Sequence, residues 1–201
     1  PSRRSRSSPD VLAGLLWERT DDVDRHPPRP APDLRSFPSE PRRHPAPLTD
    51  VVEPGEYLNE PLVGQRVETA GQWIPGDFIV VSTRFNDGVE GYWVTGQLRV
   101  AESTSIAVAI GWAPDMEAAQ SAVEELEASA EGQDVEITGR IISDEGVTIP
   151  PHDDAERLDR MSPAALLSRW HDTEQLDVYR PYLASSTATA GLDDISSPAP
   201  E

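Results

Sequence analysis

The sequence contains no cysteine and no lysine. Without cysteine there is no disulfide, thiolate zinc site, iron–sulfur cluster or thiol nucleophile, and the redox compartment stays undetermined. All 17 basic residues are arginine, against 36 acidic residues, which gives a formal net charge of -19 and a pI near 4.4. So acidic a chain lacks the basic face that displaces counterions from phosphate, which excludes general nucleic-acid binding.

Long apolar runs are also missing. The longest candidate, residues 11–17, ends at Glu18 and falls well short of the roughly 18 apolar residues that a membrane-spanning helix needs. This run lacks the small-residue cleavage site of a secretory signal. The sequence begins at Pro1 rather than Met, so its natural start can lie further upstream. As written, we expect a soluble chain.

The acidic excess belongs to one part of the chain. Residues 1–50 hold 9 Arg and 8 acidic residues, a balance of +1, whereas residues 51–201 hold 8 Arg and 28 acidic residues, a balance of -20. Ten of the 20 prolines lie within residues 1–48, a density that sustains neither a helix nor an inner strand. We therefore expect a Pro/Arg-rich flexible arm over residues 1–48, a folded acidic domain over residues 49–186 and a Pro/Ser-containing tail over residues 187–201.

Alternating and β-branched segments predict that this domain is rich in β-structure. Asn86-Asp87-Gly88 is a turn signal between two such segments. A Val-x-x-x-Gly pattern starts at Val67 and again at Val135, which suggests equivalent positions in a small barrel. Expected strands cover residues 65–73, 77–84, 91–100, 103–112, 134–143 and 175–183, and expected helices cover residues 115–130 and 162–170.

The spacing of these elements predicts the fold class. Short links between the first four strands favour an antiparallel meander, and Pro181 places the last strand on an edge because proline cannot donate to a ladder. The longer helix has an apolar stripe for one-sided packing on the sheet. We expect an α+β fold, a small antiparallel β-barrel or strongly twisted sheet of five to six strands with one longer and one short helix. The predicted stripe comprises Met116, Ala119, Val123, Leu126 and Ala130.

The sequence contains few of the motifs that are typical of catalytic or metal-binding sites. No two histidines have the i, i+4 spacing of a helical zinc site. His152-Asp153-Asp154 fits an exposed acidic loop better than a metal site, and His171 fits a helix C-terminus. There is no G-x-S-x-G elbow and no glycine-rich phosphate loop. We therefore expect a protein that is not an enzyme and holds no metal. The four histidines are His26, His44, His152 and His171.

Aromatic residues and glycines cluster at the expected strands and their ends. Tryptophan beside glycine has two interpretations: a partner-binding patch, since Trp is enriched at interfaces, or a core ring packed over a glycine where backbones approach closely. Core packing is the default of the two. The cluster comprises Trp73, Gly91, Tyr92, Trp93, Gly111 and Trp112.

The cluster also has a characteristic order. Residues 67–73 (VETAGQW) are followed by Arg84, an Asp-Gly turn, residues 91–94 (GYWV) and residues 111–114 (GWAP). This order resembles the Surfeit locus protein 1 family of cytochrome c oxidase biogenesis factors, especially its actinobacterial members, over residues 46–200. Ile110 stands where the family has Arg. The residues at family positions, and so the candidate interface, are Gly71, Arg84, Gly91, Trp93, Gly111, Trp112 and Pro114.

The resemblance implies a function. It implies an extracytoplasmic, membrane-associated domain that assists assembly of the oxidase core subunit, with oxidase subunits as partners and heme a delivery as the step. Family members carry two membrane helices around this domain and associate heme with that membrane portion, so the resemblance transfers no heme ligand to this chain. The residues themselves predict no bound cofactor, and the resemblance leaves heme a open as one.

Another class of function stays open beside this one. A soluble, acidic β-barrel binding module unrelated to respiration is compatible with the same composition and strand pattern. Such a module is an oligonucleotide/oligosaccharide-type barrel that has lost nucleic-acid affinity through its acidity. An enzyme of unknown type would need a concave site with perturbed titratable groups.

Overall fold

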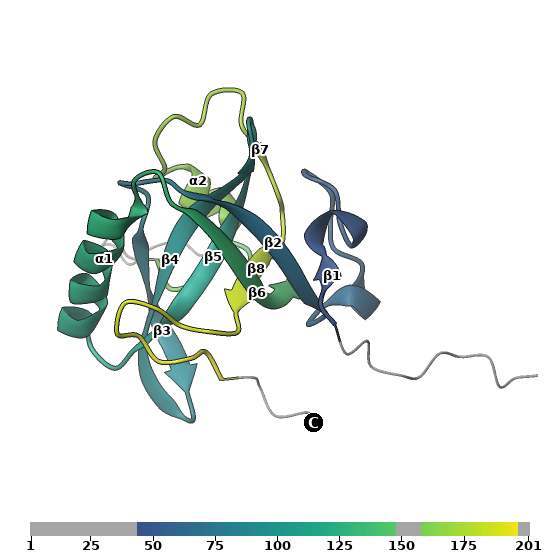
Figure 1. The fold of residues 1–201 in the computed structure, drawn as a ribbon. Coiled ribbons are helices and arrows are strands. Elements are labelled where there is room, and N and C mark those ends of the chain that lie inside the picture. The colour runs from purple at the N-terminus through teal and green to yellow at the C-terminus, as the bar shows by residue number, and fades with distance from the viewer. Residues whose placement is uncertain (1–43, 148–157, 197–201) are drawn as a thin grey trace, which may run out of the picture. The chain divides into compact units, whose positions relative to one another are not determined.

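Five strands close into a barrel in the computed structural model, which describes residues 44–147 and 158–196 (Figure 1). The barrel strands are β2 (Arg66–Trp73), β6 (Asp134–Ile142), β8 (Tyr182–Ser185), β5 (Thr104–Ala113) and β4 (Val89–Ala101), each paired with the next. The end of β2 pairs with β4 at Trp73 and Leu98, which completes the ring. Two helices, α1 (Met116–Ala130) and α2 (Pro163–Leu167), pack against it. The predicted α+β barrel is confirmed.

Smaller elements complete the described part of the chain. β3 (Ile79–Asn86) forms a hairpin with β4 through the predicted turn, where Asp87 and Gly88 have φ values of 49° and 82°, as a two-residue hairpin turn requires. The other elements are β1 (Ala46–Pro47), β7 (Asp177–Val178) and the 3-10 helices η1 (Leu48–Asp50) and η2 (Glu60–Leu62).

Glycines allow neighbouring strands to approach closely where the barrel closes. The two Val-x-x-x-Gly segments pair antiparallel, so the glycine of each faces the valine of the other. A Cβ atom on Gly71 would lie 2.3 Å from the carbonyl oxygen of Arg99 in β4, and a Cβ on Gly139 would lie 2.3 Å from that of Ala184 in β8. Both glycines are therefore needed where β2 and β6 pass over the next strand.

The core divides into two clusters on opposite faces of β5. Because side chains alternate along a strand, Ile106 and Val108 join the cluster that also holds α1, whereas Ala107 and Ala109 join the cluster that holds α2. The small alanines leave room on the second face for large rings. The buried aromatic residues of that second cluster are Trp93, Trp112, Trp170 and Tyr182.

The longer helix begins and packs largely as expected. The side chain of Asp115 accepts a hydrogen bond from the backbone N–H of Ala118 at 2.8 Å, an N-cap that satisfies one free donor of the first turn. Met116 was predicted on the buried stripe, but its side chain is 41 % exposed. The stripe instead starts one turn later, in steps of three, four and four residues. It comprises Ala119, Ala122, Leu126 and Ala130.

The shorter helix ends earlier than predicted. Ser162 is its N-cap and Pro163 its first residue, but the Ser162 hydroxyl makes no capping hydrogen bond. The helix spans five residues and ends at Leu167, and the chain continues in turns to Trp170, whose ring is buried.

The strand predicted over residues 175–183 is wrong in two respects. The chain forms two short strands there, β7 and β8, with Pro181 between them. β8 also lies inside the sheet, between β6 and β5, rather than on an edge. Pro181 cannot donate to a ladder, but it precedes β8 instead of lying within it, so the missing donor does not confine the strand to an edge.

The predicted four-strand meander holds for three strands. β3, β4 and β5 pair in sequence, whereas β2 does not pair with β3. Instead β3 and β2 pair with successive parts of the 13-residue β4. The short link between β2 and β3 follows β4 as well, since the N–H of Ile74 donates to the carbonyl oxygen of Gln97.

Residues near both predicted domain boundaries contact the barrel. β1 pairs parallel with β2, and Ala46 and Leu48 are buried. After β8, the N–H and carbonyl of Asp193 exchange hydrogen bonds with the carbonyl and N–H of Trp112 in β5. The boundaries of the arm, the domain and the tail themselves stay predictions.

Candidate functional site

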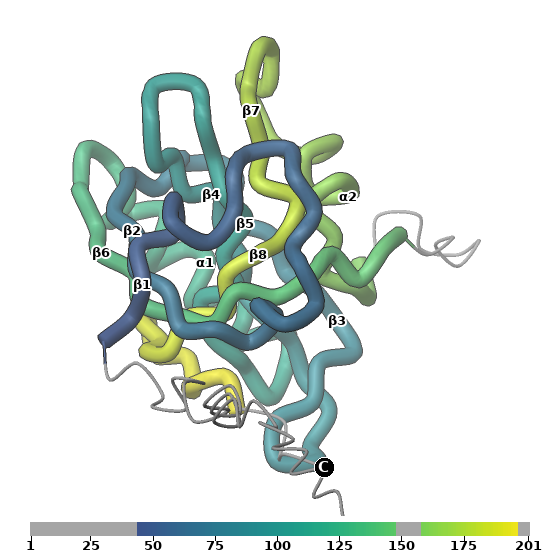
Figure 2. Tube along the Cα trace, turned by 90° about the vertical axis from the view of Figure 1, so that its right-hand side faces the viewer, coloured from purple at the N-terminus to yellow at the C-terminus, as the bar shows by residue number. Residues whose placement is uncertain are grey.

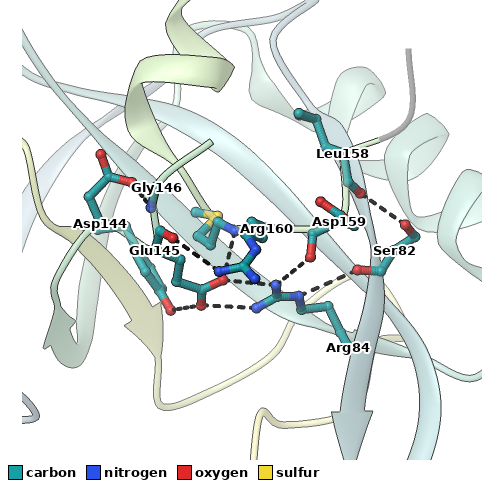
Figure 3. A network of polar contacts seen from close by, with 10 residues as sticks. Ser82, Arg84, Asp144, Glu145, Gly146, Leu158, Asp159 and Arg160 are labelled. Carbon is teal, nitrogen blue, oxygen red and sulfur yellow. Dashed lines mark hydrogen bonds and ion pairs between the residues drawn. The ribbon is translucent and has the colours of Figure 1, made fainter. Parts of the chain in front are cut away.

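A bidentate ion pair joins β3 to the segment that follows β6. Nη1 and Nη2 of Arg84 donate to the two carboxylate oxygens of Glu145 at 3.0 and 2.8 Å (Figure 3). Nη2 also donates to the carbonyl oxygen of Asp159 at 2.7 Å. The side chains of Arg84 and Glu145 are 11 % and 27 % exposed, so water screens this pair less than an ion pair on the open surface.

Glu145 accepts two further hydrogen bonds. The hydroxyl of Tyr182 donates to its Oε1 at 2.8 Å, and the N–H of Met161 donates to its Oε2 at 3.0 Å. Burial acts to raise the pKa of Glu145, but these hydrogen bonds and the positive charge of Arg84 outweigh it, so the pKa lies below the ordinary value. Burial and the neighbouring charge of Glu145 raise the pKa of Tyr182, which keeps its hydroxyl a donor.

A bulge in β3 directs Arg84 toward this carboxylate. The register with β4 shifts between Val81 and Arg84, and Thr83 adopts a φ of 57°. This conformation is strained for a β-branched residue, and bulges of this kind re-aim the following side chain. The N–H and Oγ of Ser82 both donate to the carbonyl oxygen of Leu158, at 2.7 and 3.0 Å. The bulge thus fastens the segment that contains Met161.

Two tryptophans enclose Arg84. Its guanidinium carbon lies 4.8 Å from the ring centroid of Trp93, a cation–π contact. Nε1 of Trp112 donates to the backbone carbonyl oxygen of Arg84 at 3.0 Å. Trp93 and Trp112 face each other across β4 and β5 and are 8 % and 6 % exposed. The structure thus places both rings in the core.

Two glycines make room for these contacts. A Cβ atom on Gly91 would lie 2.6 Å from the ring of Trp112, and one on Gly111 would lie 2.6 Å from the Cβ of Leu192. Any larger residue at either position would push the ring or the C-terminal segment outward. Gly91 and Gly111 therefore allow Trp112 and Leu192 to pack closely on the barrel.

A surface hollow of about 360 Å³ lies next to this cluster. Gly91 and Pro114 are among its lining residues, so two family positions border the open surface here. The charged lining residues, Glu90 and Asp115, are both acidic, and Asp115 is also the N-cap of α1. Ser82, Thr83 and Tyr92 complete the lining.

The seven residues predicted at family positions are thus divided among three places. Gly71 lies at the barrel closure, apart from the others, and Pro114 borders the hollow. The remaining five form one connected unit around Arg84. Those five are Arg84, Gly91, Trp93, Gly111 and Trp112.

Sequence reasoning missed the partners of Arg84. A buried guanidinium calls for a carboxylate, but Glu145 is one of 36 acidic residues and follows its strand without a motif. Tyr182 was predicted on an edge strand, where its hydroxyl would have no assigned acceptor. Asp159 takes part through its backbone carbonyl, which sequence cannot indicate.

A second buried carboxylate lies in the turn between β2 and β3. Asp77 is fully buried and its Oδ1 accepts from the backbone N–H of His171 at 2.9 Å and contacts Nδ1 of the same residue at 2.8 Å. This hydrogen bond and the charge of Asp77 raise the pKa of His171. The carboxylate of Glu127 in α1 accepts from the N–H of Gly76 at 3.0 and 2.7 Å. The turn is therefore fixed from two sides.

Metal binding gains no support in the described part of the chain. No group of three or more His, Asp or Glu side chains there could hold a metal ion. His26 and the His152-Asp153-Asp154 loop lie outside the described residues, and His44 is exposed. Within residues 44–147 and 158–196, no helix combines the length and the apolar character needed to cross a membrane.

Comparison with known protein families gives a match, and the matched residues include the whole site. A family model, that of the SURF1 family, matches residues 33–199. The match spans the barrel, both helices and every residue of the Arg84 network. A search of curated proteins finds no match.

Proposed function

The chain belongs to the SURF1 family, whose members are associated with cytochrome oxidase assembly, and we propose that it is a non-enzymatic assembly factor for the oxidase core subunit. The observation that carries the proposal is the family match over residues 33–199. The expected order of Gly, Arg and Trp residues, found from the sequence independently of that match, supports the same assignment.

The proposed mechanism is docking on an oxidase subunit, with the Arg84 network as the support of the docking surface. The rings of Trp93 and Trp112 are nearly covered, so a partner would meet the surface that they position. The hollow beside Gly91 and Pro114 is such a surface. We propose that it faces the oxidase at the extracytoplasmic side of the membrane, the location implied by the family.

Heme a enters the proposal as cargo of the assembly process. Among the described histidines, Nδ1 of His171 is engaged by Asp77, and His44 stands alone on the surface. These residues do not form a preorganised axial pair, so no heme ligand is assigned among the described residues. The proposed contribution is to hold the core subunit in a state that accepts heme a.

Deletion of the gene tests the proposal. We expect a strain without the chain to make the core subunit, seen on immunoblots, while the amount of assembled aa3-type oxidase and of heme a in its membranes falls. Expression of the wild-type chain in trans should restore both, and heme b content serves as the internal control. Normal assembled oxidase with normal heme a would refute the proposal and favour a binding module unrelated to respiration.

A further inference from the structure

A second hollow, of about 310 Å³, lies between α2, β7 and the segment after η1. The N–H of Gly55 donates to the carbonyl oxygen of Val178 at 3.1 Å, so the segment after η1 runs beside β7 (Figure 2). The lining is mostly apolar, and Arg180 and Asp144 are its charged members. The apolar lining residues used below are Pro163, Ala164, Leu167, Leu176 and Val178.

Arg180 is held in a fixed orientation beside this hollow. Its guanidinium carbon lies 4.3 Å from the ring centroid of Tyr57, and its Nε donates to the carbonyl oxygen of Gly55. These contacts restrain the guanidinium plane and leave both terminal nitrogens unused. Within the described residues, Nη1 and Nη2 of Arg180 make neither a hydrogen bond nor an ion pair.

Arg180 combines this restraint with the absence of a described ion pair, which Arg66 and Arg99 also lack. Residues 51–201 carry 28 acidic residues and 8 Arg, yet no described carboxylate lies within 4.0 Å of the Arg180 guanidinium. Arg84, by contrast, has both Nη atoms on one carboxylate. The two terminal nitrogens of the Arg180 guanidinium match the two oxygens of a carboxylate. Its contacts with Gly55 and Tyr57 meet part of the cost of ordering the side chain before a partner binds.

We propose that this hollow is a binding site for a protein segment that presents a carboxylate beside an apolar side chain. The carboxylate pairs with Nη1 and Nη2 of Arg180, and the apolar side chain packs on the lining from Pro163 to Val178. Tyr57, whose side chain is 78 % exposed, adds an aromatic surface next to the cation. Tyr and Arg are, with Trp, enriched among the residues that carry most of the binding energy in protein interfaces.

The charge of the domain selects a protein segment over other anions. A nucleic acid or an anionic membrane would bring many charges against a surface of net charge -20, which repels them. A single carboxylate on an otherwise uncharged segment meets Arg180 without that cost. The volume of about 310 Å³ is at the lower end for ligand pockets, which fits one apolar side chain.

Asp144 sets the direction of the bound segment. Its Oδ1 accepts from the N–H of Gly146 at 2.8 Å, and it makes no ion pair with Arg180. The lining of the hollow therefore carries one acidic residue, Asp144, which is not paired with its one basic residue, Arg180. A bound carboxylate is drawn to Arg180 and repelled by Asp144, so the segment enters in one orientation.

The test is an NMR titration of the full 201-residue chain with two synthetic peptides, N-acetyl-Leu-Glu-amide and N-acetyl-Leu-Gln-amide. The shifts followed are those of the Arg180 Nε–H and the Val178 backbone N–H. We expect dissociation constants in the millimolar range, with the Glu peptide about fivefold tighter, as an exposed bidentate pair provides. Arg180→Gln should abolish this preference, and Arg66→Gln, an equal change of charge on β2, should keep it.

Two further variants separate geometry from charge. Arg180→Lys keeps the positive charge but lacks the planar fork, so we expect about half of the preference or less. Tyr57→Leu releases the guanidinium plane and should reduce the preference while leaving the barrel folded. Equal affinity for the two peptides, no binding of either, or a preference that survives Arg180→Gln would overturn the proposal. The titration uses the purified chain, so its outcome does not depend on the proposed role in oxidase assembly.

Discussion

Replacing Glu145 with Gln tests whether its ion pair holds the segments around Arg84 together. Gln preserves the shape and one carbonyl acceptor, but its amide group faces the donors of Arg84 and the negative charge is lost. Removal of one partner from a fully buried ion pair costs about 3–5 kcal/mol. Since the Glu145 side chain is 27 % exposed, water relieves part of that cost, and we expect a loss of about 2–3 kcal/mol in the free energy of unfolding.

Urea denaturation at pH 7, followed by tryptophan fluorescence, measures this loss. Glu136→Gln is the matched control, because Glu136 is exposed on β6 and undergoes the same change of charge. We expect the control to stay within about 0.5 kcal/mol of the wild type. If Glu145→Gln costs less than about 1 kcal/mol, or no more than the control, the ion pair does not hold the segments and the reasoning fails.

The ion pair between Arg84 and Glu145 should also make the free energy of unfolding depend on pH in the acid range. Folding lowers the pKa of Glu145, so the unfolded chain binds more protons there and stability falls with decreasing pH. The contribution is complete above the ordinary value of 4.5 and is lost as the pH falls through the folded pKa. The stability difference between the wild type and Glu145→Gln should therefore narrow below about pH 4.5. A difference that stays constant down to acid unfolding would contradict this.

Two other features of the fold give separate predictions. Gly71→Ala and Gly139→Ala should each lower the free energy of unfolding by about 2–3 kcal/mol, since a methyl group must displace a backbone carbonyl. Gly132→Ala, with φ of 70° and open space around it, should cost about 1–2 kcal/mol, and equal losses at all three positions would contradict the role of barrel closure. The imidazole of His171 should titrate above 6.5 by NMR, so its stabilising effect is complete below pH 6.5 and is lost as the pH rises through the folded pKa. Asp77→Asn should lower that midpoint, and an unchanged midpoint would exclude the contact.

The sequence predicts the barrel where the physical signal is local. The Asn86-Asp87-Gly88 turn depends on residues next to one another, and it is confirmed. The helix expected from residue 115 also begins there, with Asp115 as its N-cap. The repeated Val-x-x-x-Gly pattern also predicts equivalent positions correctly. In an antiparallel ladder the two copies face each other, and both glycines meet a neighbouring carbonyl.

What the sequence could not predict depends on contacts between distant residues. Pro181 indicates a missing donor, but whether that donor falls inside a strand or just before it depends on where β8 begins, which tertiary pairing decides. Glu145 lies 61 residues from Arg84, among many equivalent carboxylates. The bulge at Thr83 has no glycine or other local signal to mark it.

The residues predicted at family positions contact mainly other segments of the chain. Arg84 connects β3 to Glu145 and Asp159, and Trp112 connects β5 to the chain around Asp193. Since these side chains are nearly covered, their contacts set the arrangement of the segments that they connect. Arg180 shows the opposite behaviour: it lies at the surface, its terminal nitrogens find no partner among the described residues, and its Nε and guanidinium plane contact Gly55 and Tyr57 all the same. A buried residue that pairs internally is explained by stability, whereas Arg180 leaves two terminal nitrogens for the carboxylate of the proposed partner segment.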